Sequence, residues 1–263
     1  MITRRYANSR DGQIHLREAG PADAPVLAFY HQTASSGAMF DKVMVRLAPT
    51  YRCLSFDSPG FGQSYQPADI PNLAYAADRL MEAMDDLGVG HFHACGHHTG
   101  GCAALEMPSR HPGRVKSLTL IGPVLVNEAE NAEYRKTFVR PFAAEPSGAF
   151  LQTAWDYLAM LGANHSLELH LREMIDHLIG QRTMPMAFNG VWNQDVESLL
   201  KGLTIPLHLM CSKDDVLWPL FERAAALRPD AHTSIVKGAD FQPDRDPEGV
   251  AQQLLSFLAK IDK

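Results

Sequence analysis

The chain has 263 residues, of which 46% are hydrophobic and 21% are charged, which is typical of an ordinary globular protein with a sizeable core. Its formal net charge of −6 at pH 7 argues against nucleic acid or an anionic membrane surface as a partner, because phosphate binding requires a basic face. No cluster of lysine and arginine contradicts this conclusion.

Two further features bear on the compartment. Residues 1–6 contain no apolar stretch of the kind found in a signal peptide, and no apolar run approaches the length of a membrane span. The four cysteines show no CxxC spacing, which favours reduced thiols that act as small core side chains. We therefore expect a cytoplasmic protein.

Strand-like and helix-like runs alternate along the first half of the chain, a pattern typical of a parallel α/β sheet. In chain order, the pattern predicts a strand at 26–30, a helix at 40–47, a strand at 51–56, a helix at 74–87, a strand at 91–95, a helix at 101–111 and a strand at 116–121. This alternation favours one domain with helices on both faces of a sheet.

The alternation stops between residues 124 and 199, where the pattern is helical and rich in methionine, phenylalanine and tryptophan. Strands return at 206–211 and 233–236, and a last helix follows at 247–258. We therefore predict a core made of residues 1–123 and 200–263, with residues 124–199 inserted as a helical cap.

The most informative stretch is 96–101, which reads GHHTGG between an expected strand and an expected helix. Glycines on both sides of His98 permit a very sharp turn of the backbone. A strand–turn–helix of this kind exposes its central side chain above the edge of the sheet, at the start of the helix. His98 is therefore the first candidate for a reactive residue.

Other motifs accompany this turn: HQTASS at 31–36, DSPGFGQS at 57–64, CSKD at 211–214, and GADF at 238–241 ahead of DPE at 246–248. With them the chain resembles the α/β-hydrolase superfamily over nearly its whole length. The resemblance implies an α/β-hydrolase fold, in which a mostly parallel central sheet is flanked by helices and carries an inserted helical cap. It also implies that Asp214 is the acidic member of the catalytic set.

Two positions depart from the family pattern. His98 stands where the family has its nucleophile, usually serine, and Asp240 stands where it has the catalytic histidine. The usual Ser–His–Asp triad is therefore absent. We predict instead a pair of His98 and Asp240, in which the carboxylate orients the imidazole, with Asp214 as a second carboxylate nearby.

The oxyanion-binding groups depend on the backbone and survive these substitutions. The backbone N–H of Thr99 and that of Gln32 or Thr33 are predicted to point at one substrate oxygen. His97 and His31 are candidates for the same region, and Trp218 is predicted to form a wall of the pocket.

These residues predict a cofactor-independent enzyme that acts on a carbonyl-containing small molecule. Hydrolysis, C–C cleavage, decarboxylation and elimination all stay open, so the enzyme is a hydrolase or a lyase, and His98 is a general base or a nucleophile. The alternative is an inactive homologue that serves as a small-molecule receptor or scaffold.

No zinc motif and no glycine-rich dinucleotide loop is present, so we expect no metal and no nicotinamide or flavin cofactor. The aromatic and methionine-rich cap favours an apolar or aromatic substrate. The sequence leaves the oligomeric state open, a homodimer included.

Overall fold

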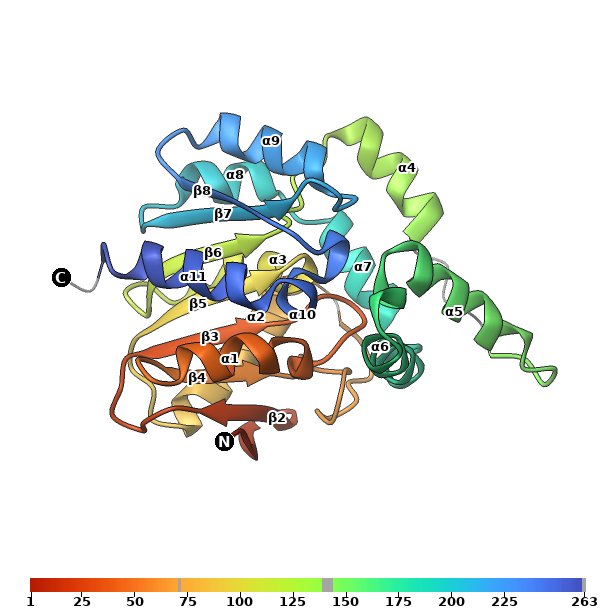
Figure 1. Cartoon of the computed structure of the whole chain (residues 1–263), viewed down its shortest axis with the longest axis horizontal. Helices are drawn as coiled ribbons and strands as arrows, with labels where there is room; N and C mark the ends of the chain where they lie inside the picture. The colour runs from red at the N-terminus through yellow and green to blue at the C-terminus, as the bar shows by residue number, and fades with distance from the viewer. Residues whose placement is uncertain (71, 139–143, 262–263) are drawn as a thin grey trace.

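A twisted sheet runs through the middle of the molecule in the computed structural model, which describes residues 1–70, 72–138 and 144–261 (Figure 1). Eight strands of these described residues pair in the order β1-β2-β4-β3-β5-β6-β7-β8. The strands are β1 (Thr3–Ser9), β2 (Gly12–Ala19), β3 (Val26–Tyr30), β4 (Arg52–Phe56), β5 (Phe92–His97), β6 (Val115–Ile121), β7 (Leu207–Ser212) and β8 (His232–Val236). All strands from β3 onward are parallel, which confirms the predicted parallel α/β sheet.

The sheet begins with a hairpin that the sequence analysis did not predict. Strands β1 and β2 pair antiparallel, and β2 pairs antiparallel with β4. The turn between β1 and β2 consists of Arg10 and Asp11, and Gly12, the first residue of β2, has a φ of 156°. The hairpin forms the edge of the sheet at β1 and is separated from β5, β6 and β7 by β4 and β3.

Helices cover both faces of the sheet, as predicted (Figure 1). They are α1 (Asp41–Leu47), α2 (Leu73–Asp86), α3 (Thr99–Arg110), α8 (Val196–Gly202), α9 (Trp218–Leu227), α10 (Gln242–Arg245) and α11 (Pro247–Leu258). One apolar cluster joins the sheet to α2, α3, α8 and α9, and a second joins its other face to α1 and α11. Neighbouring strand residues such as Leu54 and Cys53 fall in opposite clusters, because successive side chains of a strand alternate between faces.

The segment between β6 and β7 contains only helices in its described residues. They are α4 (Glu128–Phe138), α5 (Ala149–Met160), α6 (Leu167–Gly180) and α7 (Met184–Trp192), followed by α8. Helices α4 to α7 stand beside one end of the sheet (Figure 1). Residues 139–143 of the predicted cap lie outside the described residues, and the division into core and cap stays a prediction. No helix in the described ranges is both long and apolar enough to cross a membrane.

Polar contacts fasten the cap to the loop after β3. The hydroxyl of Ser35 donates to Glu173 over 2.8 Å, and that of Ser36 donates to Asp176 over 2.8 Å. Both acceptors lie on α6 and are buried. Burial, together with the neighbouring Glu173 carboxylate, raises the pKa of Asp176 to about 7. The loop at 33–36 and the cap helix α6 are thereby held together.

Candidate active site

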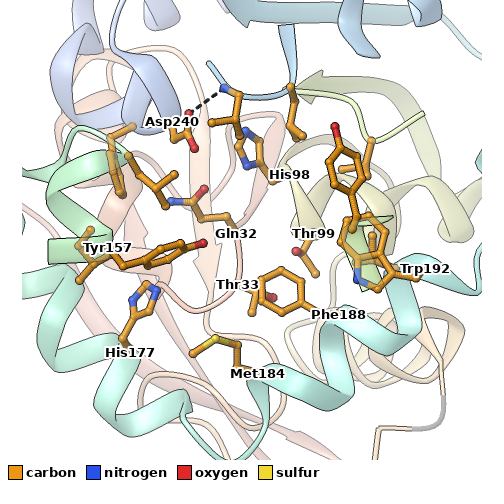
Figure 2. Close-up of a pocket in the computed structure, with 18 residues that line it drawn as sticks. Gln32, Thr33, His98, Thr99, Tyr157, His177, Met184, Phe188, Trp192 and Asp240 are labelled. Carbon is orange, nitrogen blue, oxygen red and sulfur yellow. Dashed lines mark hydrogen bonds between the residues drawn. The ribbon is translucent and has the colours of Figure 1, made fainter. Parts of the chain in front are cut away.

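A pocket lies between the carboxyl ends of the parallel strands and the cap helices (Figure 2). It has about 730 Å³ of empty space, part of which is open to solvent. Its polar lining residues include Gln32, Thr33, His98, Thr99, Tyr157, His177 and Asp240, and its apolar ones include Met184, Phe188, Val191 and Trp192 of α7.

His98 forms the apex of the turn between β5 and α3. Its φ of 46° and ψ of −113° are unusual for a residue with a side chain. The glycines around it are required, because a Cβ on Gly96 would lie 2.5 Å from the backbone of Gly101, and one on Gly100 would lie 2.2 Å from the carbonyl oxygen of Tyr30. The sequence therefore folds here into the predicted sharp turn, with His98 on the pocket wall.

The space for the His98 ring comes from Gly122, directly after β6. A Cβ at Gly122 would lie 2.3 Å from Cδ2 and 2.4 Å from Nε2 of His98. Any side chain there would displace the ring. The imidazole therefore leans across Gly122 toward the end of β7.

At the end of β7 the His98 ring meets Asp215, not the predicted Asp214. Nε2 of His98 lies 2.9 Å from Oδ2 of Asp215, whose side chain is fully buried. The backbone N–H of Asp215 donates to the carbonyl oxygen of Ser212, and this turn directs Asp215 inward while Asp214 is exposed. The prediction of Asp214 as the acidic residue is therefore corrected to Asp215, the next residue in the chain.

Asp240 lines the pocket but is not the hydrogen-bond partner that was predicted for His98. Its Oδ1 accepts from the backbone N–H of Val216 over 3.1 Å, the bond drawn in Figure 2. The imidazole leans over Gly122 and makes its hydrogen bond to Asp215 instead. The carboxylate of Asp240 therefore acts on the pKa of His98 through its charge alone.

Three ionisable groups therefore influence one another. Burial disfavours a charged His98, but the carboxylates of Asp215 and Asp240 outweigh it and raise the pKa of His98. Burial acts against the charge of Asp215 too, yet the positive His98 and its hydrogen bond lower the pKa of Asp215. Burial and the charge of Asp215 raise the pKa of Asp240 to about 6. The arrangement favours an imidazolium–carboxylate pair beside a second carboxyl group that titrates near neutrality.

His97 lies behind His98 and does not line the pocket. The two rings stack with centroids 4.2 Å apart and an angle of 9° between their planes. Nε2 of His97 lies 2.6 Å from Oε1 of Gln242, whose Nε2 donates to Oδ2 of Asp215 over 2.5 Å. Burial lowers the pKa of His97 to about 3, so its ring is neutral. Gln242 thus joins His97 to Asp215, a connection that the sequence analysis missed.

The predicted oxyanion residues divide into two groups. Gln32, Thr33 and Thr99 line the pocket, and Thr99 is the first residue of α3, where backbone N–H groups have no acceptor within the helix. His31 lies behind the loop instead: its Nδ1 is 2.7 Å from the carbonyl oxygen of Gln32, and its Nε2 accepts from the backbone N–H of Ser58. It supports the loop from outside the pocket.

Trp218 is not among the described residues that line the pocket. It begins α9, packs against the core cluster and stacks at a tilt on Phe221, with centroids 5.1 Å apart. The aromatic wall comes from Phe188 and Trp192 of α7 (Figure 2). The prediction for Trp218 was wrong, because its side chain packs against the core cluster while Val216 and Leu217 line the pocket.

Among the described residues, one group could offer ligands to a metal. Candidate donor atoms of His97, His98 and Asp215 lie within 4.8 Å of one another. His98 makes a hydrogen bond with Asp215 and His97 makes one with Gln242, whereas Nδ1 of His97 is buried with no partner among the described residues.

Comparisons with known proteins place this geometry in a family. The profile of the alpha/beta hydrolase fold family matches residues 25–194. Carboxylesterase YbfK of Bacillus subtilis is 28% identical over 96% of this chain and 86% of its own. RutD of Caulobacter vibrioides strain NA1000, provisionally named a carbamate hydrolase, is 26% identical over 94% of this chain and 96% of its own.

Comparison with solved structures finds the same relative as comparison of the sequences. The crystal structure of YbfK from Bacillus subtilis superposes with a TM-score of 0.82 and 24% identity, covering 99% of this chain and 92% of that one. The predicted fold, with its mostly parallel sheet flanked by helices, is confirmed. The chain belongs to the alpha/beta hydrolase fold family.

Proposed function

We propose that the chain is a cofactor-independent hydrolase of small carbonyl compounds such as carboxylic esters or carbamates, with His98 as the general base that activates water. The observation that carries this proposal is the hydrogen bond from His98, on the pocket wall, to the buried Asp215. The names of the relatives YbfK and RutD support an ester or carbamate bond as the target.

The hydrogen bond to Asp215 determines which nitrogen reacts. A carboxylate only accepts, so Nε2 of His98 keeps its proton and its N–H donates a hydrogen bond to Asp215. The lone pair of the neutral imidazole is then on Nδ1, which has no hydrogen-bond partner among the described residues. A base held in this way by a carboxylate supports the positive charge that forms when it takes a proton.

Hydrolysis proceeds in two steps at this site. Nδ1 of His98 takes a proton from water while the water oxygen bonds to the carbonyl carbon. The carbonyl oxygen becomes an oxyanion beside the backbone N–H groups of Thr99 and of Gln32 or Thr33. The imidazolium then returns the proton to the leaving group as its bond to carbon breaks. No covalent acyl-enzyme forms, because water takes the place of the missing serine.

The test is turnover of a panel of activated esters, carbamates and β-keto acids by the wild-type protein and His98→Ala. Loss of a positioned base predicts a fall in kcat/KM of about 10²- to 10⁴-fold. His165→Ala, which removes an exposed histidine of the cap, is the matched control and keeps full activity. Equal rates in wild type and His98→Ala would remove His98 from the mechanism. Saturable binding with no turnover of any substrate would favour the receptor alternative.

A further inference from the structure

His177 is a buried polar residue of the pocket that the proposed reaction does not use. It lies on α6, is 6% exposed and lines the pocket next to Tyr157, with ring centroids 6.5 Å apart. In Figure 2, His98 and Asp240 lie at one end of the pocket, while His177 lies toward the other, on the side of the cap.

One contact determines the tautomer of His177. Its Nδ1 lies 2.9 Å from the backbone carbonyl oxygen of Glu173, one helical turn earlier. A carbonyl oxygen only accepts, so Nδ1 is the nitrogen that carries the proton. Burial lowers the pKa of His177, although the Glu173 carboxylate acts in the opposite direction, so the ring is neutral at pH 7. Nε2 therefore has a free lone pair and is an acceptor.

This acceptor has no partner among the described residues. The ring lines the pocket, so a bound molecule can supply the missing donor. A buried polar atom left without a hydrogen bond is unfavourable once ligand displaces water from it. A site of this kind discriminates against ligands that lack a donor at that position.

The apolar part of the pocket indicates what kind of ligand would carry the hydrogen-bond donor for Nε2 of His177. Phe188 and Trp192 stack with nearly parallel rings at a centroid distance of 6.3 Å, and Met184 of the same helix lines the wall below them (Figure 2). Flat aromatic walls of this kind bury aromatic ligands well. The pocket thus combines the reaction groups at one end, an aromatic wall, and the Nε2 acceptor of His177 on the cap side.

We propose that the substrate is an aromatic carbonyl compound with a hydroxyl or N–H group on its ring, remote from the carbonyl, and that this group donates a hydrogen bond to Nε2 of His177. The inference rests on the proposed function in one respect, that the carbonyl lies at the His98 end. His177 is then a specificity-determining residue that contacts the substrate away from the reacting atoms.

The experiment measures binding of unreactive ketones, which water does not hydrolyse. The probes are 4-hydroxyacetophenone and 4-aminoacetophenone, which have a donor, and 4-methoxyacetophenone and acetophenone, which lack one. In the wild-type protein, at least one donor ligand is expected to bind about three- to tenfold more tightly than the methoxy ligand. In His177→Leu this preference disappears, while acetophenone keeps its affinity. The hydroxyl and amino probes show which donor is preferred.

Equal affinity of the methoxy and both donor ligands for the wild-type protein overturns the proposal without any variant. A donor preference that persists in His177→Leu overturns it too, because another group must then be the acceptor. Since dissociation constants are measured without turnover, the result is separate from the proposed function. An unaffected His98→Ala rate would refute the hydrolase mechanism and leave the His177 preference intact.

Discussion

The two sides of the pocket are built differently. On the side of the sheet, hydrogen bonds join His98 to Asp215 and Asp215 to Gln242. The positive charge of a protonated His98 is paired with the buried carboxylate of Asp215. On the side of the cap, Phe188 and Trp192 contribute apolar surface from α7, which stands beside one end of the sheet and contacts α2, α3 and α4 (Figure 1). Reactive groups must be held in accurate positions, and the ends of strands hold them so. An apolar wall tolerates substitution by other apolar side chains of similar size. The comparison predicts that sheet-side variants alter kcat and that cap-side variants alter KM.

The largest effect is expected from Asp215→Asn. The variant keeps a group of similar size but removes the charge that supports the His98 imidazolium, so kcat should fall by about 10²- to 10⁴-fold. Because Asp215 raises the pKa of His98, and His98 must be neutral to act, the limb on which activity rises with pH should move to lower pH. Profiles of kcat/KM against pH, with circular dichroism to verify folding, measure both effects. An unchanged rate would remove Asp215 from the mechanism.

A smaller effect, of the opposite kinetic kind, is expected from Phe188→Ala on the cap side. Loss of buried aromatic contact should raise KM by about tenfold and leave kcat nearly unchanged. Val45→Ala, which shortens an exposed apolar residue of α1, is the matched control. Steady-state kinetics with one aromatic ester suffice, and a fall in kcat at constant KM would contradict the division between the two sides.

The smallest effect is expected from Asp240→Asn. Asp240 influences His98 by charge and makes no hydrogen bond to it, so the rising limb should move to lower pH by less than it does in Asp215→Asn. The variant should also remove an inflection near pH 6, where Asp240 itself titrates. A fall in kcat as large as that of Asp215→Asn would show that Asp240 takes part in proton transfer directly.

Much of the fold was predictable from local patterns. The strand at 26–30 and the helix at 247–258 match β3 and α11 residue for residue, because apolar periodicity and the Pro247 start signal both point to the same bounds. The hairpin of β1 and β2 was missed, although Asp11 and Gly12 form a dipeptide typical of hairpin turns. Charged residues on its exposed face weakened the alternation.

The site was predictable only in part. The glycine spacing predicted the sharp turn at His98, because the turn is a local feature of the backbone. Asp214 and Asp215 are neighbours of one type, and only the turn after β7 decides which one is buried. The links of Gln242 to Asp215 and of His177 to the pocket join residues far apart in the chain, and no local pattern signals them.

Gly122 changes what should be looked for in other sequences. A histidine at the apex of the turn between β5 and α3 has room beside Asp215 only because the residue directly after the next strand has no side chain. A search for that turn alone would collect chains whose histidine cannot reach the acid. The informative signature spans three strands: histidine after β5, glycine after β6 and aspartate after β7. A chain with all three has the means to hold an imidazole in this pose.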